Sequence, residues 1–250
     1  WNAAIMEKQE KLKMRILISN IENELGRKLA ADFAGWGFDV YALACNKAAE
    51  KLSGVAYLPY DPSKETDMEE LIGFMAAVGN WDALVVSPRR IQAMNILLED
   101  ERRFQALFDH HVKTAFLLTK YVGRYFAKQG RGSVIYIGSF HDEKPTGASL
   151  PFSCSMGAIK MLHREAAIQM AGRGNAYILL EVGPMEQDVE KMRGTISPLY
   201  DHTKDCIPRR ELIREGEISQ TVKKLIGDSS LNGSEIRVDA GFLLHYEVRK

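Results

Sequence analysis

The sequence predicts an α/β fold: a doubly wound, seven-stranded parallel sheet flanked by helices. The main observation is that short β-branched apolar runs alternate along the chain with segments of helical periodicity, the pattern of parallel strands joined by crossover helices. The length of 250 residues suits one domain of this kind. The composition, 46% hydrophobic and 26% charged, is ordinary for a globular protein.

Strands are expected where β-branched and apolar residues cluster between turn residues. In chain order they are Arg15–Ile18, Asp39–Ala44, Val55–Leu58, Ala83–Val86, Val134–Ile137, Tyr177–Val182 and Glu235–Val238. The third run is followed by an Asp-Pro-Ser turn, and the fourth is stopped by Ser-Pro.

Helices are expected where apolar residues recur at intervals of three and four. In chain order they are Glu24–Trp36, Thr66–Val78, Glu99–Gln129, Ser153–Ala171 and Ile218–Ile226. Thr66 is the expected N-cap of the second helix, because its hydroxyl can accept a hydrogen bond from a first-turn amide. Gly130 is expected to close the long third helix.

The domain organisation is expected to be simple. Residues 1–14 are charged and predict an N-terminal arm, whose residues before Met6 we expect to be an expression addition. Residues 15–250 are expected to form one domain. Within it, residues 184–215 contain three prolines and lack clear periodicity, so they predict a mobile substrate lobe over the carboxyl edge of the sheet.

Charge and cysteine content exclude several classes of protein. Lys plus Arg and Asp plus Glu are balanced at 33 each, so no global field favours nucleic acid or an anionic membrane. No apolar run approaches the ~20 residues of a membrane span. Cys45, Cys154 and Cys206 show no metal-ligand spacing and predict free thiols. We therefore expect a cytoplasmic protein without a metal site, nucleic-acid partner or membrane partner.

The stretch Ser133–Lys160 carries the clearest functional pattern. A β-branched run ends at Ser139, a loop rich in Pro and Gly follows, and a helix then opens. This arrangement resembles the active-site segment of the short-chain dehydrogenase/reductase family, in which a serine precedes a Y-x-x-x-K helix by thirteen residues. Here Phe152 and Met156 stand at the tyrosine and lysine positions. The spacing is retained, and both reactive groups are replaced.

The resemblance covers nearly the whole chain, from Arg15 to Gly241, and implies a Rossmann-like domain. The family places T-G-x-x-x-G-x-G after its first strand, so that the backbone can approach a pyrophosphate. The same window here reads Ser19-Asn20-Ile21-Glu22-Asn23-Glu24-Leu25-Gly26. Only Gly26 is kept, where the resemblance implies a helix–strand packing role.

The first turn is therefore expected to hold no cofactor. Asn20 and Glu24 stand at the two phosphate-facing glycine positions. Glu22 and Glu24 also bring negative charge beside the place of a dianionic ligand, and like charges repel strongly where they are partly desolvated. Asp61 matches the aspartate that contacts adenine in the family, but an Asp-Pro-Ser turn needs no ligand to explain it.

The remaining catalytic position is Ser139, which we interpret as a structural hydrogen-bonding residue. In active family members a phenol acts as acid or base, and a neighbouring ammonium lowers its pKa and holds the nicotinamide ribose. His111 aligns with the asparagine of the family tetrad and lies on an apolar stripe, so it is interpreted as a core histidine. His141 is interpreted as an exposed loop residue, although a general base is a possible reading of it.

These losses lead to three hypotheses. The first is a non-catalytic subunit that forms a heterotetramer with an active paralogue of the same family. By resemblance, that partner supplies NAD and the catalytic tetrad and oxidises a 3-hydroxyacyl-CoA to a 3-oxoacyl-CoA. The second is a redox-independent relative of the dehalogenase or lyase type. The third is a ligand-sensing regulator with a remnant nucleotide pocket.

Overall fold

Seven parallel strands form one sheet in the order β3-β2-β1-β4-β5-β6-β7, which confirms the predicted fold class. The computed structural model describes residues 13–44, 51–87, 96–147, 149–170, 174–192 and 202–244. The strands are β1 (Arg15–Ile18), β2 (Asp39–Leu43), β3 (Val55–Leu58), β4 (Ala83–Val86), β5 (Gly132–Ser139), β6 (Asn175–Val182) and β7 (Glu235–Val238). The strand order reverses between β1 and β4. In open α/β sheets, ligands bind outside the carboxyl ends of the strands at such a reversal.

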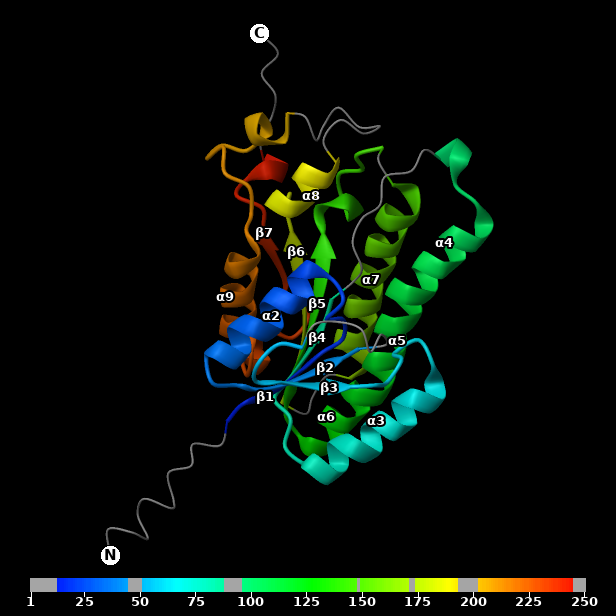
Figure 1. Ribbon diagram of the computed structural model, residues 1–250, viewed down its shortest axis with the longest axis vertical. Coiled ribbons are helices and arrows are strands. Elements are labelled where there is room, and N and C mark those ends of the chain that lie inside the picture. Colours follow the sequence, from blue (N-terminus) through cyan, green and yellow to red (C-terminus); the bar gives the residue numbers. More distant parts are fainter. Residues whose placement is uncertain are drawn as a thin grey trace, which may run out of the picture.

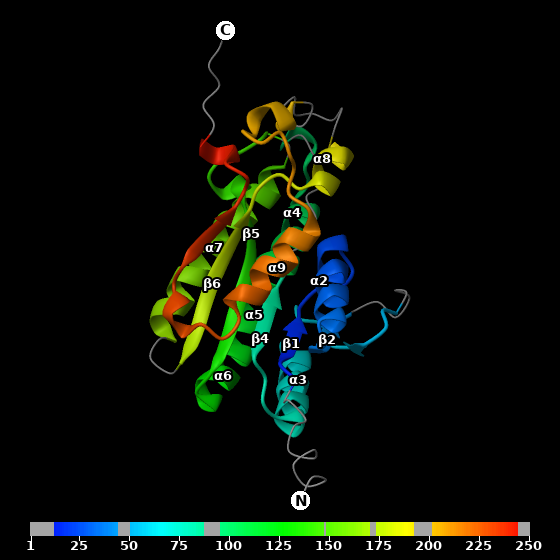
Figure 2. The same ribbon diagram turned by 90° about the vertical axis from the view of Figure 1, so that its left-hand side faces the viewer.

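Helices cover both faces of the sheet (Figures 1 and 2). The α-helices are α2 (Glu24–Gly35), α3 (Glu65–Val78), α4 (Glu101–Phe108), α5 (Thr114–Leu118), α6 (Arg124–Gln129), α7 (Leu150–Gln169), α8 (Glu186–Met192) and α9 (Glu215–Leu225). Short 3₁₀ turns are η2 (Ile96–Leu98), η5 (Phe140–Asp142), η7 (Thr203–Cys206), η8 (Ser229–Leu231) and η9 (Phe242–Leu244). Helices α2 and α9 pack on one face, and α3, the α4–α6 helix and α7 pack on the other. Among the residues the structure describes, no helix is both long and apolar enough to cross a membrane.

Strand β5 lies inside the sheet, and its side chains pack into the hydrophobic cores on both faces of the sheet. Val134 and Tyr136 pack toward α7, whereas Ile135 and Ile137 pack toward α2 and α9. All four are buried, as expected for a parallel strand covered on both faces. The buried hydroxyl of Tyr136 lies 2.6 Å from Thr119 Oγ1, which satisfies it, and burial raises the pKa of the phenol well above its usual range.

One continuous helical path replaces the predicted helix 99–129. It begins at Glu101, because the Asp100 carboxylate accepts a hydrogen bond from the Arg103 backbone N at 2.9 Å and caps the helix there. The path contains two π-helical segments, η3 (Asp109–Lys113) and η4 (Thr119–Gly123), which the periodicity did not reveal. The predicted closure at Gly130 is confirmed, since this glycine adopts a left-handed conformation with φ 78°.

The predicted starts of α3, α7 and α9 were wrong, as was that of the long helix. Helix α3 begins at Glu65, and its N-cap position is held by Lys64 without a side-chain hydrogen bond, so Thr66 is not the cap. The Thr66 hydroxyl instead bonds to its neighbour Asp67 at 3.3 Å. Helix α7 begins at Leu150, three residues before the predicted start. Its first turn contains Pro151, whose fixed φ suits that position.

The segment 184–215 has more regular structure than predicted. It contains α8 and η7, and an extended stretch pairs Met185 with Ile213 in a parallel bridge. Residues 193–201 of this segment lie outside the described residues, as do residues 1–12 of the predicted arm and Cys45. Helix α9 starts at Glu215, earlier than predicted, because Glu217 accepts a hydrogen bond from the Arg214 backbone N at 2.9 Å.

Candidate functional site

The turn after β1 fastens the first strand to the fourth. Ser19 is buried, and its hydroxyl oxygen accepts a hydrogen bond from the Ser87 backbone N at 2.9 Å. The Ser19 backbone N in turn donates to the Val85 carbonyl at 3.0 Å. The two strands are thereby tied together at the point where the strand order reverses, and the Ser19 side chain serves this link.

Side-chain amide oxygens accept hydrogen bonds from backbone N–H groups of the same turn. Asn20 is buried, and its Oδ1 accepts a hydrogen bond from the Glu22 N–H at 3.0 Å. Asn23 is the N-cap of α2, and its Oδ1 accepts from the Gly26 N–H at 2.5 Å. In dinucleotide-binding folds the N–H groups of this turn face the pyrophosphate. Here two of them are already hydrogen-bonded within the chain.

A contact from the opposite side closes over this turn. Asn20 Nδ2 lies 3.4 Å from Nε2 of His110, which belongs to the π segment η3 of the long helix. This contact joins the β1–α2 turn to the long helix. Sequence reasoning missed both His110 and Asn23. An asparagine just before a helical run is a recognised N-cap signal, so Asn23 was predictable. His110 was not, because the π segment was not foreseen.

Gly26 is required for close packing inside the turn. A Cβ at this position lies 1.7 Å from the carbonyl oxygen of Asn20, which no side chain can tolerate. Glu22 and Glu24 point outward and are exposed. Solvent screens exposed charges, so their repulsion of an anion is weaker than the sequence argument assumed. The hydrogen bonding of the turn is the stronger obstacle to a diphosphate.

The Asp61 turn is self-contained. The Asp61 carboxylate accepts hydrogen bonds from the backbone N and hydroxyl of Ser63, at 3.0 and 2.7 Å, and pairs with Lys64 at 3.2 Å. Partial burial works to raise the pKa of Asp61, but the bonds from Ser63 and the charge of Lys64 outweigh it and lower that pKa. The match to the adenine-contacting aspartate therefore has a local structural explanation.

Phe152 stands between two histidine rings at the carboxyl edge of the sheet. It is 6% exposed, and its ring centroid lies 5.8 Å from that of His111 and 5.1 Å from that of His141. Both contacts are nearly perpendicular, the edge-to-face arrangement that aromatic rings prefer. Met156, one turn further along α7, is 1% exposed in the same apolar cluster.

The two histidines are held by serines. His111 Nδ1 lies 2.9 Å from the Ser155 oxygen, and the Ser155 hydroxyl donates to the Phe152 carbonyl at 2.8 Å. Since that hydroxyl has a single proton, its oxygen accepts from His111 Nδ1–H. Half-buried Ser139 lies with its Oγ 2.8 Å from His141 Nδ1. Ser139 is thus linked through His141 to Phe152, whose ring also contacts His111 beside Ser155.

The interpretation of His141 as an exposed loop residue was wrong. It is 5% exposed, because the chain turns back into the fold through η5, and its ring packs against Phe140 with centroids 4.0 Å apart. Burial disfavours the charged imidazolium and lowers the pKa of His141 to about 3. His141 is therefore neutral at physiological pH. No loop composition rule distinguishes this inward turn from a solvent-exposed one.

A compact group of charges lies on the other side of the same loop. Lys160 of α7 pairs with Glu143, Asp142 and Glu181 at 2.8, 3.1 and 2.5 Å. Arg237 of β7 pairs with Glu143 at 2.7 Å and with Glu181 at 3.2 Å. Burial is the main cause that raises the pKa of Asp142, to about 6, against the lowering effect of Lys160.

The three carboxylates Asp142, Glu143 and Glu181 lie close enough together to offer metal ligands. The ammonium of Lys160 occupies their midst, however, so the cluster is already charge-compensated. Partial burial opposes the charge on Lys160, but the carboxylates of Glu143, Glu181 and Asp142 outweigh it and raise its pKa. These contacts provide an explanation for the cluster that needs no metal ion.

The sheet order, the turn at the strand reversal and the serine at the end of β5 define the class of nucleotide-binding α/β folds. Residues 21–243 match the family model described as Enoyl-(Acyl carrier protein) reductase. The chain belongs to this family, within the short-chain dehydrogenases and reductases. Glucose 1-dehydrogenase from Gluconobacter oxydans is 25% identical to it over 248 residues, which cover 92% of each chain.

Solved structures of relatives have the same fold. Gluconate 5-dehydrogenase from Burkholderia cenocepacia, in complex with NADP and tartrate, gives a TM-score of 0.83 at 20% identity, covering 93% of this chain and 96% of that one. A tyrosine-to-phenylalanine variant of ElxO with NADPH bound gives a TM-score of 0.80 at 17% identity, covering 94% of this chain and 100% of that one.

Proposed function

We propose that this chain is a non-catalytic subunit of a heteromeric short-chain dehydrogenase. One observation carries the proposal: Phe152, at the position of the catalytic phenol, is packed between the rings of His111 and His141. A benzyl side chain has no exchangeable proton, and Met156 brings no positive charge to the lysine position. The site therefore lacks the acid–base group and the cation that hydride transfer to or from a carbonyl requires in this family.

The first turn supports the proposal that this chain holds no dinucleotide. A diphosphate has to displace the Asn20 and Asn23 oxygens from the Glu22 and Gly26 N–H groups and separate Asn20 from His110. A phenylalanine at this position does not by itself prevent dinucleotide binding, since a tyrosine-to-phenylalanine variant of ElxO has NADPH bound. We accordingly place NAD in the active partner.

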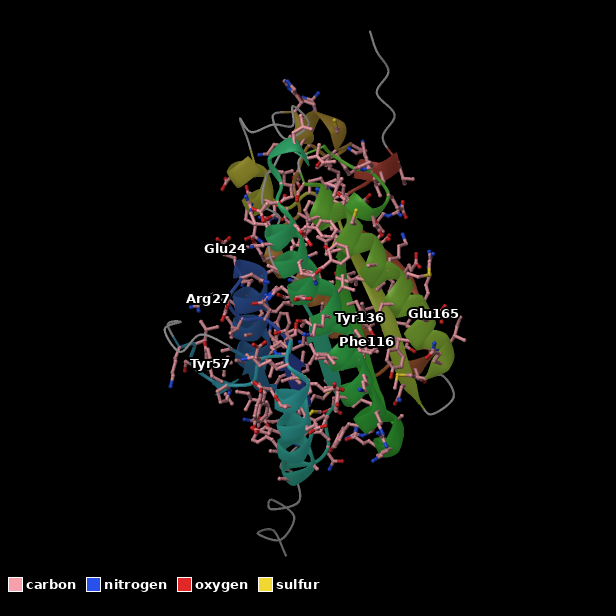
Figure 3. The ribbon with its side chains drawn as sticks, turned by 90° about the vertical axis from the view of Figure 1, so that its right-hand side faces the viewer. Glu24, Arg27, Tyr57, Phe116, Tyr136 and Glu165 are labelled. Atoms are coloured by element: carbon pink, nitrogen blue, oxygen red, sulfur yellow. The ribbon has the colours of Figure 1, made fainter. Side chains whose placement is uncertain are left out.

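An exposed apolar face supplies a surface for that partner. Phe116 on α5, and Met161 and Ile168 on α7, are 51%, 54% and 74% exposed. Figure 3 shows Phe116 and Glu165 on these two neighbouring helices, on the same side of the molecule. In the resembling family the equivalent helices of two protomers form a four-helix bundle. Burying such side chains contributes about 25 cal/mol for each Å² removed from water.

The substrate is proposed from the resemblance. A heterotetramer of this kind fits a dehydrogenase that oxidises a 3-hydroxyacyl-CoA, such as 2-[hydroxy(phenyl)methyl]succinyl-CoA in anaerobic toluene degradation. In that arrangement the partner subunit performs hydride transfer to NAD, and this chain stabilises the assembly. The proposed location is the cytoplasm, where acyl-CoA thioesters and free thiols are both stable.

Co-expression of this chain with an intact member of the same family from the same genome tests the proposal. We expect native mass spectrometry to give a heteromer of two chains of similar size, and NAD to bind once per partner chain. Replacing Phe116, Met161 and Ile168 by Ser should dissociate the heteromer while circular dichroism stays unchanged. An assembly of this chain alone, with turnover of an alcohol and NAD, contradicts the proposal.

Restoration of the family residues gives a second test. The variant Phe152→Tyr with Met156→Lys should remain inactive while Asn20 and Glu24 are present, because the first turn stays hydrogen-bonded to itself. Calorimetric titration with NAD and NADPH should show no binding by either the wild type or this variant. Micromolar binding by the wild type favours the regulator hypothesis, and turnover without cofactor favours the redox-independent one.

A further inference from the structure

A groove at the amino edge of the sheet lies far from the site described above. It runs between α3 and the η4–α6 part of the long helix and has a volume of about 730 Å³. Figure 1 shows α3 and α6 together at the end of the molecule opposite α8 and the carboxyl ends of the strands. This volume lies within the range of small-molecule sites, which is about 300–1,000 Å³.

Two cations line the groove without compensating partners. Arg124 and Lys128 are one helical turn apart on one face of the long helix, and both are exposed. Within the described part of the chain, neither side chain makes a hydrogen bond or an ion pair. The cation that precedes them on this face, Lys120, is instead paired with Glu65 of α3. The one acid in the wall is Glu69, so the groove has a net positive charge.

Two tyrosine rings alternate with these cations. Tyr121 and Tyr125 are half-buried, and each is fixed by its hydroxyl: Tyr121 donates to Glu65 at 2.8 Å, and Tyr125 donates to the Met75 carbonyl at 3.3 Å. The bond to Glu65 raises the pKa of Tyr121, and burial raises that of Tyr125. Both phenols therefore stay neutral and present fixed aromatic surfaces beside the cations.

The floor of the groove contains the C-terminal end of α3, and carbonyl groups at a helix C-terminus repel anions. Here the guanidinium of Arg15, which also pairs with Asp39 at 2.8 Å, donates to the carbonyl oxygens of Gly79, the C-cap of α3, and of Asn80, the residue after it. Arg15 therefore satisfies these two carbonyl oxygens, and Arg124 and Lys128 do not bond to them.

We propose that this groove binds a small anion that carries a planar ring, such as an aromatic carboxylate or a nucleotide phosphate. Arg124 and Lys128 would hold the carboxylate or phosphate, since charge-assisted hydrogen bonds are the strongest in proteins. The ring would pack against Tyr121 or Tyr125. The site is separate from the first turn and from Phe152, so this inference does not depend on the proposed function.

Titration of the full chain with benzoate, ADP and inorganic phosphate tests the proposal. We expect at least one ring-bearing anion to bind with a Kd below about 1 mM, and phosphate alone to bind more weakly. Preference for ADP or for benzoate identifies which ring-bearing class the groove accepts. If neither of them gives saturable binding in this range, or if phosphate binds as tightly, the proposal is wrong.

Three variants locate the binding. Arg124→Gln with Lys128→Gln should weaken it about tenfold or more, because two charged hydrogen bonds are lost. Ala76→Trp should weaken binding by a similar factor, because a large side chain at this exposed position of α3 fills part of the groove. Lys204→Gln with Lys224→Gln removes the same charge from exposed sites elsewhere and should leave the affinity unchanged. Equal losses in the two double variants indicate a general charge effect and overturn the proposal.

Discussion

Two neighbouring residues in the loop after β5, His141 and Asp142, face opposite environments. His141 contacts Phe140 and Phe152 in a neutral, aromatic setting, whereas Asp142 faces the charges of Lys160 and Glu181. Burial shifts both toward their uncharged forms, lowering the pKa of His141 to about 3 and raising that of Asp142 to about 6. The same physical cause gives the two residues opposite responses to acid.

The difference indicates how the former catalytic loop is held in place. On the aromatic side, packing fixes the loop without any charge. On the other side, α7, β6 and β7 fix it through ion pairs around Lys160. Each side can be disrupted separately, so the contribution of each to stability can be measured.

The largest effect is expected on the charged side. Lys160→Met removes the ammonium from among Asp142, Glu143 and Glu181, two of which have nearly buried side chains. Arg237 still pairs with Glu143 and Glu181 in this variant, but the buried Asp142 is left without a cation. Breaking a buried ion pair is costly, so the free energy of unfolding at pH 7 should fall by about 3–5 kcal/mol. Urea denaturation measures this loss. Lys224→Met, at an exposed position of α9, is the matched control. An equal fall in the free energy of unfolding for this variant would contradict the interpretation.

The aromatic side should be nearly as sensitive. Phe152→Ala opens a cavity between His111 and His141, and the free energy of unfolding should fall by about 3 kcal/mol. Phe116→Ala removes the same atoms from a half-exposed position and should cost much less in the isolated chain. If the two variants unfold at the same urea concentration, Phe152 is not packed as described.

Acid should destabilise the protein through His141. Its pKa is lowered on folding from 6.5 to about 3, so the unfolded state binds the proton first as the pH falls below about 6.5. The stability that comes from a neutral, buried His141 is therefore present above that pH and is lost on acidification. The free energy of unfolding should fall by about 2 kcal/mol between pH 7 and pH 5. His141→Gln should remove this loss. Denaturation curves at the two pH values, compared with those of the wild type, test it.

Asp142 should act in the opposite direction with a smaller effect. Its pKa is raised on folding from 3.8 to about 6, so the folded state binds the proton first and is stabilised as the pH falls through 6. The free energy of unfolding should rise by about 1 kcal/mol from this group between pH 7 and pH 5. Asp142→Asn should lose this gain and therefore appear more acid-sensitive than the wild type. An unchanged pH profile contradicts the assignment.

The sequence predicted the framework of the fold well because each strand is a short apolar run between turn residues. Four strands were predicted to the residue: Arg15–Ile18, Val55–Leu58, Ala83–Val86 and Glu235–Val238. Helix starts were predicted less well, since they depend on hydrogen bonds such as those of Asp100 and Glu217, which local periodicity does not reveal.

The site was predictable in its residues but not in its contacts. The spacing from Ser139 to Phe152 and Met156 assigned these residues to a strand end and to the following helix, where the structure has them. The burial of His141 and the contact between Asn20 and His110 depend on tertiary packing across 90 residues of sequence, which no local pattern encodes.

The π segment η3 has a consequence for the contact between Asn20 and His110. A π turn accommodates one residue more than an α turn over the same rise, so it shifts the phase of every side chain that follows by about 100°. Deleting one residue within Asp109–Lys113 should restore a regular helix and swing His110 away from Asn20. A single codon deletion, rather than a substitution, is then the direct way to separate the long helix from the β1–α2 turn at this point.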